Sequence, residues 1–219
     1  MFTKMPTLLF LFTIISYTGA NAENQHTQSS IKDERNITKM TLIFKEQFYE
    51  IQQNTSKIEF HVDSPVGGVW GNFQDFNGSF MMANSGAHNQ SAVVDIDVRS
   101  LDANLSFISA MLKSETFFDV EKFPSMRFVG SSFEWFNDTQ AVLKGYLTIN
   151  NVTQAVAFYV DLINATVEND YSERITLKAS TTIKRSEFGI YALLPVVSDK
   201  VNLFMRIDAL KRDTIISML

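Results

Sequence analysis

The sequence predicts an all-β protein in which one antiparallel sheet of about eight strands closes into a barrel. Several segments carry apolar side chains at every second position, which is typical of half-buried strands. No helical pattern separates consecutive strand pairs, so the strands should follow one another as a meander. A sheet this large exposes two unpaired edges unless it closes on itself, and closure therefore favours a barrel.

The first half of the chain contains three predicted strand segments, at residues 57–63, 69–80 and 94–99. In the first and third of them apolar and polar side chains alternate, which predicts one buried and one solvated face. The second is a strand-like run rich in aromatic residues. Gly71 and Gly78 interrupt the second segment and indicate bulges or sharp bends. The inward residues are Ile58, Phe60, Val62, Phe73, Phe80, Val94, Ile96 and Val98.

Residues 101–128 break this rhythm. Between 101 and 113 the apolar residues recur at helical spacing, which predicts a helix. Three phenylalanines (117, 118 and 123) then precede Pro124, which cannot donate a ladder hydrogen bond and so marks the start of a strand. We expect a helical or irregular cap whose aromatic side chains turn inward.

Strands resume after Pro124 and continue to the end of the domain. Asn150-Asn151 is a tight hairpin signal between two of them. The inward positions of these later strands are Met126, Phe128, Leu147, Val156, Phe158, Val160, Leu177, Ile183, Val201, Leu203, Met205 and Ile207.

The N-terminal 22 residues have the features of a cleaved secretory signal peptide. Lys4 supplies a positive charge, residues 8–15 form a short apolar run, and Ala20-Asn21-Ala22 is a small-residue cleavage pattern. The apolar run is too short to span a bilayer, and no later stretch is long enough, so we expect no integral membrane segment in the mature chain.

The remaining chain divides into three parts. A polar leader covers residues 23–46, and its later part fits a short helix or a strand about equally well. The barrel should occupy residues 47–212, followed by a tail at 213–219.

Composition restricts the class of function. The chain has no cysteine, which excludes disulfides and a thiolate nucleophile. Without the signal peptide it carries 18 basic and 24 acidic side chains, a balance that argues against nucleic acid as a partner. Its 19 phenylalanines need either a large core or a lined cavity.

The polar residues give no positive argument for an enzyme. His26, His61 and His88 lack a second histidine at ligand spacing, so no metal site is expected. Asp95 and Asp97 share one strand face, but a solvated outer face explains them better than a catalytic pair. No nucleophile elbow, phosphate loop or dinucleotide motif is present.

Three stretches together resemble the YceI-like family of secreted and periplasmic lipocalin-like proteins. They lie at residues 112–128 (Leu-Lys-Ser, Phe-Phe-Asp, Lys-Phe-Pro), 145–153 (Gly-Tyr-Leu-Thr-Ile-Asn-Asn-Val-Thr) and 184–201 (Lys-Arg-Ser-Glu-Phe-Gly, then Val-Ser-Asp-Lys-Val). The resemblance covers the chain from about Tyr49 to Ala209.

The resemblance implies an extended eight-stranded antiparallel lipocalin-like barrel with a helical cap over a long apolar channel. It also implies a ligand with an isoprenoid tail, such as a polyprenyl phosphate or a quinone-like molecule, or a fatty-acid-type lipid. The chain departs from the family pattern at Thr55, Ser64 and Met111, where histidines are frequent. These departures put a head-group contact in doubt but leave the channel untouched.

We therefore predict a secreted, periplasmic, non-enzymatic protein that binds an amphiphilic lipid. Met111, Leu112, Phe117 and Phe118 should close one end of the channel. Arg185 is a candidate for a structural or head-group charge near the rim, but a solvated arginine in a turn explains it better. The predicted ligand-binding wall consists of Phe60, Val62, Phe73, Phe80, Ile96, Val98, Phe128, Leu147, Phe158 and Leu203.

Periodicity cannot distinguish a hollow barrel from a filled one. The alternative is thus a filled barrel that acts as an envelope stress or protein-interaction module without a lipid ligand. Trp70 or Phe204, if exposed, could serve a homodimer or a rim equally well.

Overall fold

The computed structural model describes residues 47–65, 67–82, 92–168 and 172–212. The predicted signal peptide (1–22), the leader (23–46) and the tail (213–219) lie outside the described residues, as do His26 and His88.

The described residues form eleven strand segments, one α-helix and three short 3₁₀ turns. The strands are β1 (Gln47–Ile51), β2 (Lys57–Val62), β3 (Val69–Phe73), β4 (Phe76–Met82), β5 (Ala92–Asp97), β6 (Leu101–Ala103), β7 (Ser125–Trp135), β8 (Gln140–Ile149), β9 (Val152–Glu168), β10 (Ser172–Lys184) and β11 (Lys200–Arg212). The helix is α2 (Ser106–Lys113), and the turns are η1 (Gln53–Thr55), η2 (Val98–Ser100) and η3 (Arg185–Phe188).

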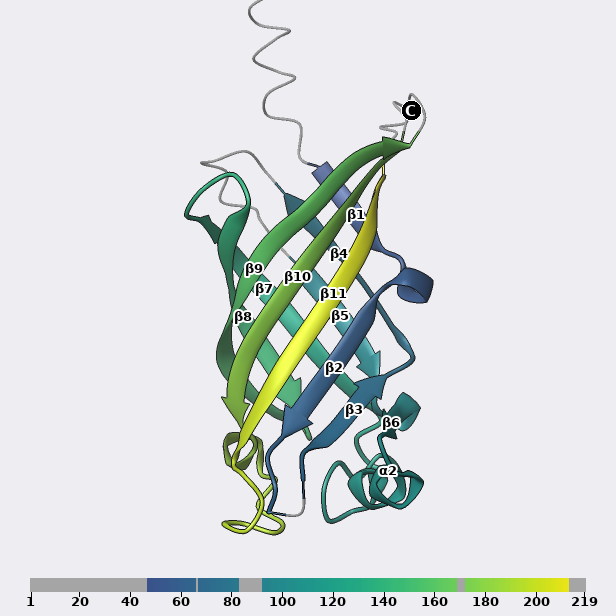
Figure 1. Ribbon diagram of the computed structural model, residues 1–219, viewed down its shortest axis with the longest axis vertical. Coiled ribbons are helices and arrows are strands. Elements are labelled where there is room, and N and C mark those ends of the chain that lie inside the picture. Colours follow the sequence, from purple (N-terminus) through teal and green to yellow (C-terminus); the bar gives the residue numbers. More distant parts are fainter. Residues whose placement is uncertain (1–46, 66, 83–91, 169–171, 213–219) are drawn as a thin grey trace, which may run out of the picture. The chain divides into compact units, whose positions relative to one another are not determined.

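These strands form a closed antiparallel barrel (Figure 1). The ring runs β1-β4-β5-β7-β8-β9-β10-β11, and β11 pairs back with β1 to complete it. β2, β3 and β6 continue the wall below β1, β4 and β5, because β2 pairs with the first half of β11 and β3 pairs with both β2 and β6. The prediction of an all-β, eight-stranded antiparallel barrel is confirmed.

The eleven segments reduce to eight barrel strands because three strands are interrupted. β1 and β2 are separated by η1, β3 and β4 by Gln74 and Asp75, and β5 and β6 by η2. The three breaks are joined to one another: Gln53 Nε2 donates to the Gln74 carbonyl at 2.8 Å, and the Gln74 amide donates to the Ser100 carbonyl at 3.4 Å. The breaks therefore form one line across three neighbouring strands.

The helix is shorter than the helical spacing predicted. Residues 101–103 form β6, in which Leu101 is buried and pairs with Phe73 of β3. Leu105 keeps an extended backbone, so α2 begins only at Ser106. Ser109 fixes the junction because its hydroxyl accepts a hydrogen bond from the Ala103 amide at 2.8 Å. Tertiary pairing with β3 overrides the helical pattern at the start of this segment.

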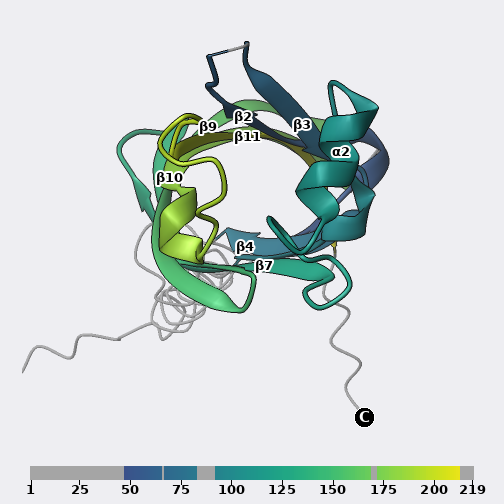
Figure 2. The same ribbon diagram turned by 90° about the horizontal axis from the view of Figure 1, so that it is seen from below.

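The β8–β9 connection is a two-residue hairpin, as predicted. Asn150 and Asn151 have φ angles of 48° and 62°, the left-handed values that a type I′ turn requires at both positions. Since the strands are antiparallel, this hairpin lies at the same end of the barrel as the β10–β11 connection and α2 (Figures 1 and 2). We call this end the cap end.

Candidate functional site

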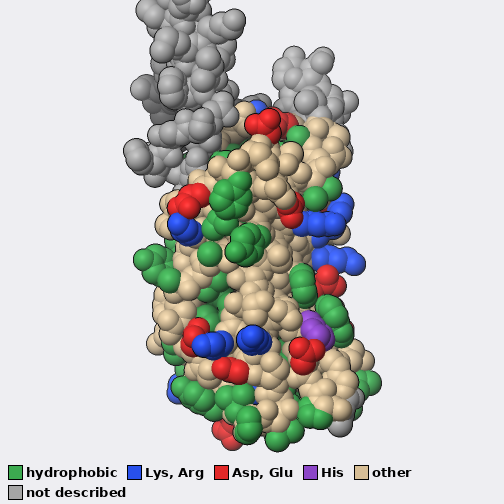
Figure 3. Space-filling view, turned by 60° about the vertical axis from the view of Figure 1, so that its left-hand side comes forward, with side chains coloured by type: hydrophobic (Ala, Val, Ile, Leu, Met, Phe, Trp, Pro, Cys, Tyr) green, Lys and Arg blue, Asp and Glu red, His purple; other side chains and the backbone are tan. Residues whose placement is uncertain are grey.

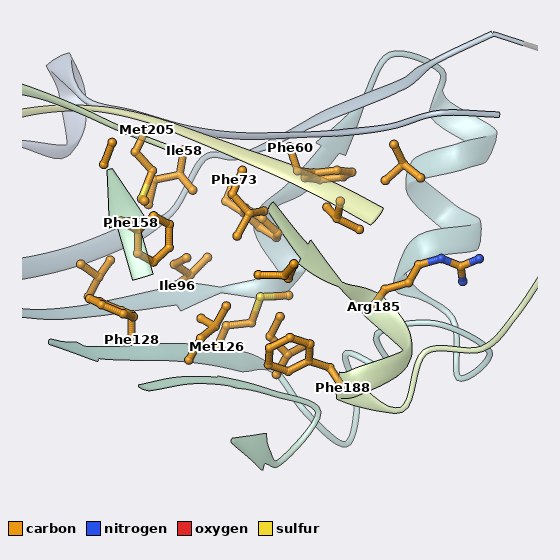
Figure 4. A pocket seen from close by; sticks show the side chains of 18 of the residues that line it. Ile58, Phe60, Phe73, Ile96, Met126, Phe128, Phe158, Arg185, Phe188 and Met205 are labelled. Atoms are coloured by element: carbon orange, nitrogen blue, oxygen red, sulfur yellow. The ribbon is translucent and has the colours of Figure 1, made fainter. Parts of the chain in front are cut away.

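The barrel encloses a cavity of about 200 Å³. Side chains from most strands, from α2 and from the β10–β11 connection surround it (Figure 4). Apart from Arg185, every described residue that lines it is apolar. The barrel is therefore hollow, and its interior offers an almost purely apolar environment.

Thirteen of the fourteen side chains predicted to bind a ligand lie in the wall of this cavity. They are Phe60, Val62, Phe73, Phe80, Ile96, Met111, Leu112, Phe117, Phe118, Phe128, Leu147, Phe158 and Leu203. Their contact with a ligand stays a prediction.

Val98 is the exception. β5 ends at Asp97, and Val98 begins the 3₁₀ turn η2, so the period of two that predicted its direction no longer applies. The side chain is buried in the hydrophobic core, with 1% of its surface exposed, but it does not line the cavity. Val98 is a packing residue of the break in this strand.

Other lining residues were missed as ligand contacts. Several of them, including Leu177, Ile183 and Met205, occupy alternating strand positions and could have been included on that ground. Ile190, Leu193 and Val197 lie in the irregular segment between β10 and β11, where no periodicity points inward. No pattern in the sequence indicates that these three side chains point inward.

Aromatic rings form much of the wall. Phe128 and Phe158 meet edge to face, with ring centroids 5.1 Å apart and an angle of 83° between the ring planes. Phe60 and Phe73 pack with their centroids 5.8 Å apart. Such pairs stabilise each other beyond simple burial, so these rings give the cavity a defined shape.

Arg185 is the buried charge at the cap end, with 6% of its surface exposed. Its guanidinium donates to four backbone carbonyls, and the partners lie at Ser198 (2.9 Å from Nε), Ile190 (3.3 Å from Nη1), Ala192 (2.6 Å from Nη1) and Val197 (3.1 Å from Nη2). All four carbonyls belong to the β10–β11 connection. Because four of its five N–H groups are used in this way, Arg185 holds the connection in place.

Asp199 completes this anchor. Its carboxylate accepts hydrogen bonds from the Ser186 amide at 2.9 Å and from the Ser186 hydroxyl at 2.8 Å. Desolvation by burial raises the pKa of Asp199. The Ser186 hydrogen bonds and the charge of Arg185 lower it by more than that, so the pKa of Asp199 lies below its usual value. Burial lowers the pKa of Arg185, and the charge of Asp199 opposes this change.

The cap segment is tied to the barrel by the β8–β9 hairpin. The Asn150 side-chain amide donates to the Phe117 carbonyl at 2.8 Å. Phe117 and Phe118 line the cavity together with Met111 and Leu112, as the sequence predicted. The cap is thus part of the cavity wall and is connected to it by hydrogen bonding as well as by packing.

The polar candidates lie outside the cavity. Asp95 pairs with Arg127 at 3.1 Å and Asp97 pairs with Arg99 at 2.6 Å, so each carboxylate has its own cation. His61 packs against Trp70 with the two rings tilted and their centroids 4.3 Å apart. Within the described residues no group of histidine and acidic side chains could hold a metal ion.

Trp70 also contacts Phe204, and both side chains are partly exposed on the outer wall. In the described part of the chain no helix has the length and apolar character needed to cross a membrane.

Comparison with known proteins places this geometry in a family. The family model described as "YceI-like domain" matches residues 49–209. A UPF0312 protein of Pseudomonas aeruginosa is 29% identical over 157 residues, which cover 71% of this chain and 81% of the relative. A UPF0312 protein of Pseudomonas putida is 30% identical over 122 residues, and this match spans 56% of the chain and only 64% of the relative.

Solved structures share the fold. BcnA of Burkholderia cenocepacia superposes with a TM-score of 0.63 at 22% identity, covering 72% of this chain and 98% of that one. A polyisoprenoid binding domain from Saccharophagus degradans has a TM-score of 0.57 at 12% identity, covering 75% and 98%. The hollow barrel, the cap and the match across residues 49–209 show that the chain belongs to the YceI-like family.

Proposed function

We propose that the protein binds and carries, or sequesters, an amphiphilic lipid with an isoprenoid tail, such as a polyprenyl phosphate or a quinone-like molecule. The observation that carries this proposal is the apolar cavity, in which Arg185 is already committed to backbone carbonyls. Such an interior suits a hydrocarbon tail and offers no free charge to a head group. The fold shared with a polyisoprenoid binding domain supports the same ligand class.

The head group should therefore remain at the cap end, outside the cavity. Burying the tail stabilises the complex by roughly 25 cal/mol for each Å² of apolar surface removed from water. Ordering a flexible tail offsets part of this gain. Arg185 then acts indirectly, by shaping the segment at the opening.

The cavity volume limits how much tail fits without rearrangement. An apolar cavity of roughly 150 Å³ accommodates a molecule the size of benzene, and the cavity here is about 200 Å³. A longer tail thus requires side chains to move. Met111, Met126 and Met205 lie in the wall, and the flexible thioether side chain adapts readily to different shapes.

The mature protein should act without catalysis and outside the cytoplasm. Asp95 and Asp97, the two carboxylates that share a strand face, are each paired with an arginine, which supports a binding role. The sequence pattern of residues 1–22 supports secretion through a cleaved signal peptide into the periplasm.

Native mass spectrometry combined with organic extraction tests the proposal. The purified protein should release a lipid with an isoprenoid tail, and the emptied barrel should take up a fluorescent prenyl probe. Comparing the uptake of fatty-acyl probes with that of the prenyl probe shows which class of hydrocarbon tail the barrel prefers. A barrel that carries no lipid and takes up neither probe would favour the alternative, a protein-interaction module without a lipid ligand.

A further inference from the structure

The cap end carries an exposed apolar rim. Of the thirteen large apolar side chains that are exposed among the described residues, six come from α2 with its preceding residue and from residues 189–198. These six, which we call the rim, are Leu105, Phe107, Met111, Tyr191, Leu193 and Val196. α2 and the 189–198 segment lie on opposite sides of the ring of strands at this end (Figure 2), and apolar side chains also gather at the lower end of the face seen in Figure 3.

The 189–198 segment is unusual for an exposed connection because it contains no charged side chain. Its sequence is Gly-Ile-Tyr-Ala-Leu-Leu-Pro-Val-Val-Ser. Tyr191 is 64% exposed and Val196 is 67% exposed. A polar or charged composition is the norm for loops in water, so this segment is built for a different contact.

The exposure of this segment is imposed by its structure. Arg185 donates to four carbonyls inside it, and the Val197 amide donates to the Leu193 carbonyl at 2.8 Å. Leu193 has a φ of 62°, a left-handed conformation that costs a branched side chain free energy, and it remains 52% exposed. The surrounding hydrogen bonds maintain an unfavourable conformation that presents an apolar side chain to the outside.

α2 contributes the opposite side of the rim. Ile108, Met111 and Leu112 line the cavity, whereas Phe107 points away from it and is 65% exposed. A surface helix normally turns a polar face outward. Here both faces carry large apolar residues, so the outer face needs an apolar partner.

The rim is continuous with the cavity. Met111 and Leu193 line the cavity and are also exposed, at 37% and 52% respectively. The rim and the cavity wall thus share two residues at the cap end.

We propose that the rim docks onto the surface of a lipid bilayer, with Phe107 and Val196 inserted at the level of the acyl chains. This proposal rests on the proposed function, because a hydrocarbon tail that leaves the cavity over the rim then passes into the bilayer without crossing water. The continuity of the rim with the cavity favours a bilayer over a second copy of the chain, since a partner protein placed there would cover the opening.

The charges beside the rim indicate which bilayer it suits. Lys184 pairs with Glu187, with 3.6 Å between Nζ and Oε1. The Asp199 carboxylate accepts a hydrogen bond from the Ser186 hydroxyl. The basic residues Lys113 and Lys122 of the cap are accompanied by Glu115, Asp119 and Glu121. The rim therefore has no net basic charge to attract anionic head groups. Docking should occur on zwitterionic phosphatidylcholine vesicles and should persist at high salt.

A fluorophore placed on the rim tests this directly. The chain has no cysteine, so Val196→Cys creates a single labelling site for an environment-sensitive dye. Phe136→Cys is the matched control, because Phe136 follows β7 at the opposite end of the barrel and is also 67% exposed. With phosphatidylcholine vesicles we expect a blue shift from the dye at 196 and none from the dye at 136.

Substitution of the rim provides the second measurement. The Phe107→Ser, Val196→Ser double variant should bind vesicles about tenfold more weakly in flotation, because two inserted apolar side chains are lost. Phe136→Ser should bind like the unaltered protein. Equal vesicle binding by the double variant, by Phe136→Ser and by the unaltered protein would overturn the proposal. In the dye experiment, a blue shift at both positions 196 and 136, or at neither, would overturn it as well.

Two further outcomes separate this proposal from its alternatives. A shift at 196 that grows with protein concentration in the absence of vesicles would make the rim an interface between copies and overturn membrane docking. Extraction of a lipid without any vesicle response would also overturn docking while leaving the proposed function intact. A vesicle response from a protein that yields no lipid and takes up no probe would support docking and reject the lipid cargo.

Discussion

Phe128 of β7 and Phe158 of β9 meet edge to face across the intervening strand β8, with 5.1 Å between their ring centroids. Both rings line the cavity. They therefore contribute to the stability of the barrel and also set the space available to a tail.

Phe158→Ala should enlarge the cavity and shift binding towards longer or bulkier tails. We expect a loss of about 3 kcal/mol in the free energy of unfolding, near the lower limit for such substitutions, because the ring already borders empty space. Denaturant unfolding and uptake of prenyl probes of increasing length measure the two effects. An unchanged length preference in a folded variant would show that this pair does not limit the tail.

The hydrogen bond from Asn150 to the Phe117 carbonyl should hold the cap closed. Asn150→Gly keeps the left-handed turn but removes this bond, and it should destabilise the cap by about 1 kcal/mol and accelerate probe uptake and release. Asn151→Gly is the matched control, since it also keeps the turn and no side-chain bond to the cap is lost. Identical release rates for the two variants would argue against this role of Asn150.

Arg185→Lys should loosen the 189–198 segment, although the charge is preserved. A lysine ammonium is a point charge and cannot reproduce the planar arrangement that reaches four carbonyls at once. We expect a loss of about 3 kcal/mol in the free energy of unfolding and faster proteolysis within 189–198. A variant as resistant as the unaltered protein would contradict the anchoring role.

Lowering the pH should weaken the hydrogen bonds that hold the β10–β11 connection, because Asp199 becomes protonated. The lowered pKa means that the folded state favours the carboxylate, so this stabilisation is complete above the ordinary aspartate pKa of about 4. It disappears as the pH falls through the lowered pKa of the folded state. Proteolysis within 189–198 by an acid-active protease should increase over this range, and in Asp199→Asn this pH dependence should be absent.

Asp97→Ala separates the binding interpretation from an enzymatic one. Asp97 pairs with Arg99 on the outer wall and caps η2 by accepting a hydrogen bond from the Arg99 amide. Its removal should leave probe uptake unchanged and lower the free energy of unfolding by about 1 kcal/mol. Phe128→Asp, by contrast, buries an unpaired charge in the cavity wall and should abolish uptake or folding. Loss of uptake in a well-folded Asp97→Ala protein would indicate a function for the outer carboxylates.

The strands, their inward faces and the hairpin at Asn150-Asn151 could be predicted because a period of two and a left-handed turn are local properties. The true start of α2 could not, because Leu101 pairs with Phe73, which is distant in sequence. The same limit applies to Val98, whose direction depends on the break at η2. Whether the barrel is hollow depends on how side chains from all strands fill one volume, and no single segment contains that information.

Arg185 shows a different limit. Its position in a family-like stretch predicted a charge near the rim, but a buried guanidinium bound to four carbonyls depends on the path of residues 190–198. That path has no periodic signature. The residues most closely linked to the opening of the cavity were therefore the least accessible to sequence reasoning.

The three aligned breaks at η1, Gln74-Asp75 and η2 give the barrel two unlike walls. β7 to β10 are long, and their ladders shift register only between Gly130 and Ser132 and between Thr176 and Leu177. The opposite wall is broken along one line, a crease where side chains replace part of the ladder hydrogen bonding. Bending is concentrated where a sheet has the fewest ladder bonds, so the creased wall is the compliant one and the continuous wall the stiff one. We therefore expect the creased wall to flex when a bound molecule needs more room, while the ring of paired strands stays closed.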